Sequence, residues 1–477
     1  MAVKEGPLAA APAFFIFASL CVSILLGVRT SAPASVIAAV SALFAAAAIF
    51  AGTEREVPGW RRMLALVVTL SFVLSFISAA RMREKISFPD SFEAYGKILL
   101  ARDWGKTRAY LIETPYGRAA AYSRENLREG AGVRLRAASF DFKRAEERGG
   151  FDEMLFWRGK GAVKKLELFE IRETSVPSGL AAWRACLDEL FRARLYPLSA
   201  AYMSALTTGR RSAAIEEPHE RAGTIHLLSV SGFHVGVLAG LLFFLKRGGA
   251  ARTVTVSALL WLYVAFAGFP PGGVRAAAMA QICIAAEALG RPYSSFNNVS
   301  AAACLMLLYN PWSFFDVGWR LSVLAALFIT AGVRLVGRGF AGAAATSVLV
   351  WFVSAPVVAE VFSSVPVAGL TANLVAVPYF AVVFPLIFAL CLPPLLGLPL
   401  APLFAETSEL ILRFSQSALD ALASLTPAQV GYSTPLFVLA AAIFCSAAAL
   451  RCGAPLRRAP FIVLFSLAVL LYFRAVL

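Results

Sequence analysis

The stretch RMLALVVTLSFVLSFISAA, residues 62–80, decides the fold class, because it is almost wholly apolar and the polar sequence RMREK follows it directly. An apolar run of this length crosses a hydrocarbon core of roughly 30 Å as an α-helix. Two similar runs precede it, at about 8–28 and 33–51, and the first is long for the hydrophobic part of a signal peptide. We therefore expect three membrane helices within residues 1–80.

The composition extends this assignment to most of the chain. Hydrophobic residues make up 59% of the 477 residues and charged residues 15%, with a mean hydropathy of +0.71. A soluble domain carries about 25% charged residues. Apolar segments resume near 224–245, 253–268, 273–290, 298–309, 319–336, 342–361, 366–400, 434–450 and 460–476. The sequence predicts a polytopic α-helical membrane protein with about 10 to 12 membrane helices.

The polar stretch between these groups contains a β domain, which we place at 88–175. In GVRLRAASF, residues 132–140, Val133 and Leu135 alternate with Arg134 and Arg136, as in a strand with one wet face. Further strand candidates are FEAYGKILLAR (92–102), KTRAYLIE (106–113), GRAAAY (117–122) and AVKKLELFEI (162–171). Five short strands predict a small β-barrel of the OB-like type inserted into the membrane protein.

Residues 178–222 are predicted to form amphipathic interfacial helices. In LAAWRACLDELFRARLYPL, helical spacing puts Trp183, Leu187, Leu190 and Phe191 on one face, and Arg184, Asp188 and Arg192 on the other. Such a helix is expected to lie on the membrane surface, with its apolar face toward the lipid.

Positive charge predicts the orientation. If the β domain lies outside after three crossings, most basic residues between the later helices fall in cytoplasmic turns. These are Lys246, Arg247, Arg252, Arg291, Arg334, Arg338, Arg451, Arg457 and Arg458, whereas the opposite turns keep chiefly Arg275 and Arg320. We therefore expect a multi-pass protein of the cytoplasmic (inner) membrane with an extracytoplasmic β domain.

A polar motif, GTIHLLSVSGFHVGVLAG at 223–240, interrupts the apolar segments. It carries His226, Ser229, Ser231, Gly232 and His234. Two histidines without a nearby carboxylate or thiolate are a poor metal site, and Ser231 lacks the GxSxG context of a nucleophile. Two interpretations stay open: hydrogen bonds that hold helices together, or the lining of a polar path.

Other polar residues lie in the later apolar segments. Arg275 follows the turn PPGG, where it either snorkels to the interface or serves a function. Asp316 and Arg320 are four residues apart, as in a helical ion pair, and Asp316 is also suited to cap a helix. Around Asn373, the residues Gly369, Pro378 and Pro385 predict a broken helix that borders a transport path.

The sequence contains none of the catalytic motifs considered. DWGKT at 103–107 lacks the first glycine of a P-loop, and three histidines cannot supply a histidine-rich metal cluster. We therefore expect no enzyme activity, no metal and no cofactor on this chain.

Several ordered blocks resemble the competence domain of the ComEC family. They are AGTIHLLSVSGFHVGVLAGLL, YVAFAGFPPGGVRAAAM, LGRPYSSFNN, LLYNPWSFFDVGWRLSVLA and GLTANLVAVP, within about 200–410, and GGFDEMLFWRGKGA at 149–162 resembles the end of that family's OB-like domain. The family pattern has GFQLS where this chain has GWRLS, so Arg320 adds a positive charge. Many members add a C-terminal metallo-β-lactamase-like domain, which we do not expect here because the chain ends at Leu477 after a membrane segment.

The resemblance implies a channel domain at 223–430, followed by C-terminal membrane helices at 431–477. It makes the histidine–serine motif the signature of the channel core, and Arg275, Asp316 and Asn373 fall on matching positions. The implied function is import of single-stranded DNA in natural transformation. The implied partners are DNA, membrane lipid, a separate cytoplasmic motor, a separate nuclease and, in a homodimer, a second copy of the chain.

The barrel offers basic and aromatic residues for the strand, and Trp104, Tyr110, Arg134 and Arg136 are the candidates. Three alternatives remain open. The chain could transport another anionic or polar solute, act as a non-transporting scaffold whose barrel binds a partner, or be an inactive relative.

Overall fold

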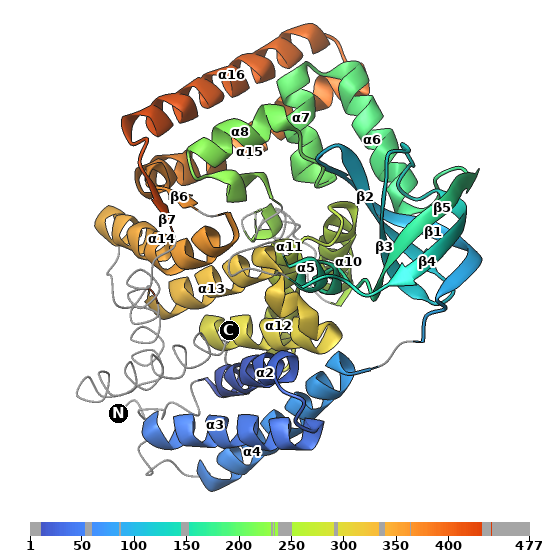
Figure 1. The fold of residues 1–477 in the computed structure, drawn as a ribbon. Helices are drawn as coiled ribbons and strands as arrows, with labels where there is room; N and C mark the ends of the chain where they lie inside the picture. Colours follow the sequence, from blue (N-terminus) through green and yellow to red (C-terminus); the bar gives the residue numbers. More distant parts are fainter. Residues whose placement is uncertain are drawn as a thin grey trace.

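The computed structural model describes residues 11–52, 60–84, 87–144, 152–229, 232, 234–236, 250–290, 294–332, 339–362, 364–431 and 440. It is mostly α-helical, with one closed five-stranded β-barrel beside the helices (Figure 1). The segments predicted at 434–450 and 460–476, and most of 224–245, lie outside the described residues.

The N-terminal group consists of α2 (Pro12–Arg29), α3 (Ala34–Gly52) and α4 (Trp60–Met82). Buried hydroxyls join α2 to α4, because Ser19 Oγ lies 3.1 Å from Ser75 Oγ and Ser23 Oγ donates to Ser75 O at 2.9 Å. Large apolar side chains of α3 and α4, such as Leu43 and Leu66, point outward. An apolar exterior over a serine-bonded interior is the arrangement expected in lipid.

Within the described residues, four helical stretches are long and apolar enough to cross a membrane, namely Pro12–Arg29, Arg61–Met82, Ala341–Phe362 and Ala368–Leu396. Shorter apolar helices run over Ala34–Ala47, Thr253–Phe266, Ser295–Tyr309 and Val317–Ala331. The prediction of a multi-pass helical membrane protein is thus confirmed.

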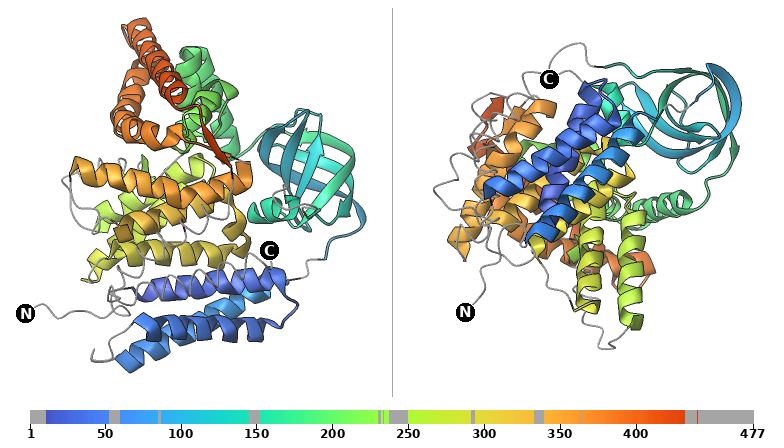
Figure 2. Two further views of the ribbon diagram at one scale, coloured as in Figure 1. Left: turned by 60° about the vertical axis from the view of Figure 1, so that its left-hand side comes forward. Right: turned by 90° about the horizontal axis from the view of Figure 1, so that it is seen from below.

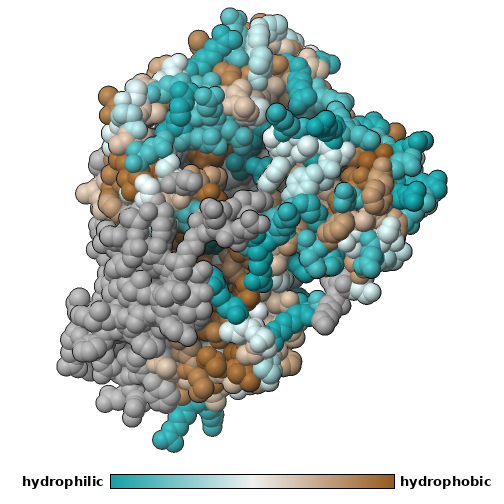
Figure 3. All heavy atoms as spheres, viewed as in Figure 1, coloured by the Kyte–Doolittle hydropathy of each residue, from teal (hydrophilic) through white to brown (hydrophobic). Residues whose placement is uncertain are grey.

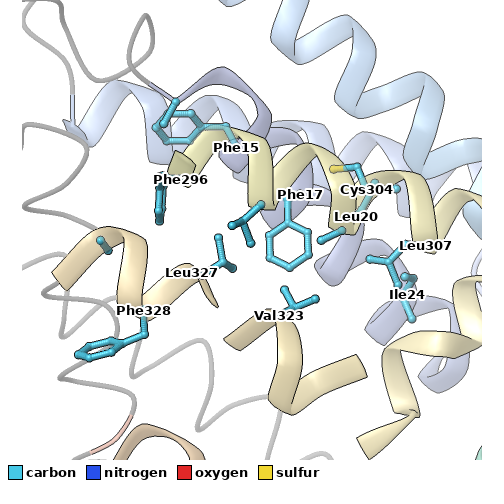
Figure 4. Packing of buried hydrophobic residues seen from close by; sticks show 14 of the residues in the cluster. Phe15, Phe17, Leu20, Ile24, Phe296, Cys304, Leu307, Val323, Leu327 and Phe328 are labelled. Atoms are coloured by element: carbon cyan, nitrogen blue, oxygen red, sulfur yellow. The ribbon is translucent and has the colours of Figure 1, made fainter. Parts of the chain in front are cut away.

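The central helices form layers on the N-terminal group. They are α10 (Ala250–Phe266), α11 (Pro271–Ala288), α12 (Ser295–Tyr309), α13 (Val317–Gly332) and α14 (Phe340–Phe362), with the short 3₁₀ helix η2 (Pro311–Phe315) between α12 and α13. Figure 2 shows α2, α12, α13 and α14 as successive layers with the barrel beside one end. Phe17 of α2 lies among Val323 and Leu327 of α13, in a core that α12 shares (Figure 4).

The barrel contains the five strands predicted from the sequence. They are β1 (Ser91–Trp104), β2 (Thr107–Thr114), β3 (Gly117–Ser123), β4 (Gly132–Phe140) and β5 (Lys164–Ser175), in the closed order β1-β2-β3-β5-β4. Only β3 and β5 pair in parallel. Val133 and Leu135 point into the barrel, whereas Arg134 and Arg136 are exposed, as the alternation predicts.

A second apolar cluster lies outside the barrel, over β2 and β3. The helix α5 (Glu153–Gly159), which belongs to the connection between β4 and β5, packs Trp157 against Ala109, Leu111 and Ala120. Trp157 Nε1 donates to Tyr122 Oη at 2.7 Å. The two strands are therefore buried on both faces.

A third group of helices packs around α15 (Ala368–Leu396) and α16 (Ala401–Leu425). It contains α6 (Leu180–Arg194), α7 (Pro197–Thr207), α8 (Ala213–Arg221) and the 3₁₀ helix η1 (Ile225–Leu228). The strands β6 (Ser364–Pro366) and β7 (Gln429–Gly431) pair beside it. Tyr379 Oη and Ser415 Oγ, 2.9 Å apart, join the two long helices.

In α6, Trp183 of the predicted apolar face is 65% exposed, whereas Asp188 of the predicted polar face is buried. Asp188 is buried because it accepts from Thr208 Oγ1 at 2.8 Å and pairs with Arg210.

One expectation is corrected here, namely the helix predicted to break near Asn373. The helix α15 is continuous over Ala368–Leu396, although Pro378, Pro385, Pro393 and Pro394 lie inside it. Neighbouring helices and local adjustments let membrane helices tolerate proline, so these residues do not end the helix.

Candidate functional site

The start of the polar motif packs directly against the start of α15. Gly223 has a φ of +68°, and a Cβ at this position would lie 2.8 Å from Gly369 Cα. Asn373 Nδ2 donates to Gly223 O at 3.5 Å. Small residues let two backbones approach this closely inside a membrane protein. The blocks AGTIH and GLTAN, far apart in the sequence, therefore meet in space.

The middle of the motif makes local contacts. His226 lies in η1. Ser229 Oγ donates to His226 O at 2.8 Å, so the two residues form one turn rather than a side-chain pair. Ser231 lies outside the described residues.

Gly232 brings the motif against Arg275. A Cβ on Gly232 would lie 3.3 Å from Arg275 Nη2 and 3.7 Å from Ala276 Cβ. Arg275 is half-buried at the head of α11, and its Nη1 donates to Ser322 O of α13. The guanidinium therefore does not simply snorkel to an interface; it holds α11, α13 and the motif together, and the missing side chain of Gly232 leaves room for it.

His234 is buried and stacks on Phe384 of α15, with ring centroids 5.8 Å apart. Phe384 in turn contacts Phe380, at 4.8 Å between centroids. Phe380 also contacts His219, a histidine outside the motifs described above. The ring of His219, from α8, lies 5.4 Å from the ring of Phe380.

His219 is fully buried and both ring nitrogens have partners. Nε2 lies 2.9 Å from Tyr202 Oη, and Nδ1 lies 2.8 Å from Thr224 Oγ1. Burial lowers the pKa of His219 to about 4, so the ring is neutral at pH 7. One signal in the sequence was available: all three histidines of the chain fall between positions 219 and 234.

Asp316 and Arg320 do not pair with each other. Asp316 Oδ1 caps α13 by accepting from Trp319 N at 3.0 Å, as the capping interpretation predicts. Asp316 Oδ2 lies 2.6 Å from Lys160 Nζ, and Arg320 Nη2 lies 2.8 Å from Glu360 Oε2. The helical ion pair is thus corrected: each residue has a partner on another element, because the Asp316 carboxylate is turned toward the cap and toward α5.

Lys160 belongs to a joint between the barrel and the membrane helices. Asn310, just before η2, donates from Nδ2 to Arg158 O at 3.2 Å and to Gly159 O at 3.1 Å. The guanidinium of Arg158 lies over the ring of Trp312, 5.5 Å from its centroid. These contacts join the block FDEMLFWRGKGA to the block YNPWSFFDVGW.

A second joint between the barrel and the helices consists of ion pairs. Glu129, in the barrel loop before β4, accepts from Arg184 Nη1 at 3.2 Å and from Arg210 Nη2 at 2.7 Å. Arg210 Nη1 also lies 2.8 Å from Asp188 Oδ2. Both carboxylates are buried, and two guanidiniums balance them. The barrel is therefore fixed to α6 and to the segment after α7.

The four barrel candidates divide into two kinds. Arg134 and Arg136 are exposed. Tyr110 is fully buried in the barrel core, with its hydroxyl bonded to Glu125 O and Leu127 N, and it cannot stack on a base. Trp104 is half-buried against Phe156 of α5, 5.4 Å between centroids. The assignment of Tyr110 is corrected, because its side chain points into the barrel interior.

The region around these contacts holds buried polar atoms without a hydrogen-bond partner among the described residues. They include Arg275 Nε, Asn298 Oδ1, Trp351 Nε1 and Asn373 Oδ1. Trp351 Nε1 and Asn373 both flank Gly369. A buried polar group that lacks a protein partner ordinarily needs water or a polar ligand. In the described part of the chain, no group of three His, Cys, Asp or Glu side chains is placed to hold a metal ion.

Comparison with known proteins gives two matches. The family model described as "Competence protein" matches residues 206–457, which is more than half of the chain. "ComE operon protein 3" of Bacillus subtilis (strain 168) is 28% identical over 196 residues, covering 39% of this chain and 25% of that protein. The match therefore spans about a quarter of the relative's length. No solved structure matches.

Proposed function

The chain belongs to the competence protein family, and on this premise we propose that it is a membrane channel that imports single-stranded DNA during natural transformation. The observation that carries the proposal is that the matched segment, 206–457, contains the contacting motif blocks and the buried polar atoms. A DNA strand carries about one negative charge per nucleotide and cannot cross lipid without a wet, polar path.

The residues around Gly223, Gly232 and Gly369 support such a path. Arg275 supplies one positive charge, Asn373 and Trp351 supply neutral hydrogen-bonding groups, and His234 supplies a flat ring. A single cation among neutral polar groups attracts a phosphate backbone without holding it, because conduction requires weak, repeated contacts. Ser231, which lies in the same motif, belongs to this proposed lining on sequence grounds.

The barrel is the proposed receiving element on the extracytoplasmic side of the cytoplasmic membrane. Its first joint keeps it beside the ends of α12 and α13 (Figure 2), and its second joint fixes it to α6 and to the segment after α7. Arg134 and Arg136 provide exposed positive charge there. In this proposal, a separate cytoplasmic motor supplies the force for import, and a separate nuclease degrades the strand that is not imported. Membrane lipid and a second copy of the chain are further proposed partners.

The test is uptake of labelled DNA into a DNase-resistant state in a host that takes up DNA. Wild type, a deletion strain and Arg275→Gln would be compared at matched membrane levels. We expect deletion to abolish internal DNA and Arg275→Gln to reduce it severalfold. Arg62→Gln, outside the matched segment, is the control and should leave uptake unchanged.

Undiminished uptake in the deletion strain would refute the proposal. Competition separates it from transport of another solute: if uptake of a radiolabelled anionic solute requires this chain and is unaffected by excess single-stranded DNA, the solute is the substrate.

A further inference from the structure

The outer face of β2 and β3 is closed in this barrel. In OB-folds, oligonucleotides bind over the face of strands 2 and 3 and beside the loops that join strands 1–2 and 4–5. Here α5 covers that face: Trp157 is 1% exposed, and Tyr122, Trp104 and Phe156 pack around it. The connection between β4 and β5 is also engaged, because Lys160 binds Asp316 at the head of α13.

The outer face of β1, β4 and β5 is open instead. Figure 1 shows these three strands on the side of the barrel turned away from the membrane helices. Tyr95 of β1 is 66% exposed and Phe169 of β5 is 62% exposed. Arg134 of β4 and Arg172 of β5 lie in register with Tyr95, and Arg136 lies two residues along β4, toward Phe169. We call these five residues the open face.

A β-bulge places Phe169 on this face. Arg136 pairs with Glu170 and Ala137 pairs with Leu168, so Phe169 is the extra residue of β5. Leu166, Leu168 and Ile171 point into the barrel, and Phe169 is exposed. Bulges commonly re-aim a side chain at a functional surface, and a large apolar ring aimed at solvent needs a reason.

The spacing of the two rings suits a nucleic-acid strand. Tyr95 and Phe169 are two strands apart and offset by about three residues, which corresponds to roughly 14 Å from standard strand dimensions. Bases of a single strand stack on such aromatic rings without sequence preference, while cations contact the phosphates between them.

The charges of this side permit reversible binding. Arg136 has no ion-pair partner among the described residues, whereas Arg134 pairs with Glu93 and Arg172 with Glu170. Both pairs are largely exposed, and exposed ion pairs contribute little to stability, so a phosphate displaces them at little cost. Glu167 adds a third carboxylate, and Figure 3 shows hydrophilic and hydrophobic residues mixed on this side. Affinity would therefore come mainly from stacking.

We propose that the open face, and not the customary face over β2 and β3, is the single-stranded-DNA site of the barrel. This rests on the proposed function in DNA uptake and names the surface that first receives the strand. Tyr95 and Phe169 stack on bases, and Arg136, with Arg134 and Arg172, contacts the backbone.

The test measures binding of a fluorescein-labelled oligo-dT to the purified full-length protein in lipid nanodiscs, by anisotropy at several salt concentrations. We expect Tyr95→Ala and Phe169→Ala each to raise Kd at least about fivefold, and Phe169→Tyr to keep wild-type affinity. Arg136→Gln should lower the slope of log Kd against log salt by about 0.7. Trp183→Ala, which removes a ring of equal exposure outside the barrel, is the control.

If wild type and both alanine variants bind oligo-dT with equal affinity, the inference that the open face binds DNA is wrong. The proposed channel function is tested separately, by the uptake experiment described above. Absence of any binding to wild type would overturn it as well. If the alanine variants lose DNA uptake in cells but keep oligo-dT affinity, the face serves a protein partner and the inference is wrong.

Discussion

Lys160 Nζ lies 2.6 Å from Asp316 Oδ2, and these two residues are 156 positions apart in the chain. The lysine follows the helix that covers one face of the barrel, and the aspartate caps the apolar helix α13. One carboxylate therefore orders a helix end and fixes the barrel to it.

This double role can be separated by substitution. Asp316→Asn keeps an acceptor for Trp319 N–H and removes the ion pair, so we expect a loss of about 1 kcal/mol in the free energy of unfolding. Asp316→Ala also removes the cap and should cost about 1 kcal/mol more. Thermal unfolding in detergent measures both, with Asp141→Asn, in the more exposed pair with Lys164, as the neutral control. Equal losses for Asn and Ala would show that the cap contributes nothing.

Gly232→Ala tests the contact between the polar motif and Arg275. The new methyl would lie 3.3 Å from Arg275 Nη2 and push the guanidinium away from Ser322 O. Loss of this hydrogen bond should lower the free energy of unfolding by about 1 kcal/mol, and we expect DNA uptake at matched membrane levels to fall. Gly236→Ala is the matched control, because its Cβ would meet nothing within 4 Å. If both substitutions act alike, the contact with Arg275 is not the cause.

Gly223→Ala tests the crossing of the motif with α15. Gly223 and Gly290 have similar φ values, +68° and +60°, so alanine strains the backbone by about 1–2 kcal/mol at either position. Only at Gly223 does the Cβ also meet backbone, Gly369 Cα at 2.8 Å. We expect Gly223→Ala to destabilise by about 1–3 kcal/mol more than Gly290→Ala. Equal unfolding midpoints for the two variants would contradict the close crossing.

His219 should make stability depend on pH. Its pKa of about 4 in the folded protein lies below the ordinary value near 6.5, so folding favours the neutral ring. This stabilisation is complete above pH 6.5 and is lost as the pH falls toward 4, by at most about 3 kcal/mol. His219→Gln cannot titrate, so the unfolding midpoint of this variant should fall less than that of the wild type as the pH is lowered over this range. If His219→Gln keeps the wild-type pH dependence of the unfolding midpoint, that dependence comes from other titratable groups.

Much of the fold follows from local patterns. Apolar runs such as 62–80 indicate membrane helices because a lipid core requires that length, and the alternation around Val133 and Leu135 indicates strands because side chains alternate between the faces of a sheet. The capping role of Asp316 is local in the same way. The prediction of a break near Asn373 was wrong because proline effects depend on neighbouring helices.

The candidate site was only partly predictable. The sequence marked Gly232, Arg275 and Asn373 as candidates. Gly232 lies against Arg275, and Asn373 donates to Gly223 O of the polar motif. The sequence did not mark His219, whose partners Tyr202 and Phe380 come from α7 and α15. Tyr110 was misassigned because β2 has apolar residues on both faces, so that alternation did not show that Tyr110 points into the barrel.

A membrane protein with a small β-barrel can be predicted from the sequence, because hydrophobic length and period are properties of short segments. Which polar residues meet, and which barrel face stays open, depends on tertiary packing. Gly223 against Gly369, Lys160 against Asp316 and α5 over β2 and β3 are contacts between segments far apart in the chain. Such contacts depend on how whole helices and strands pack, and no local pattern encodes them.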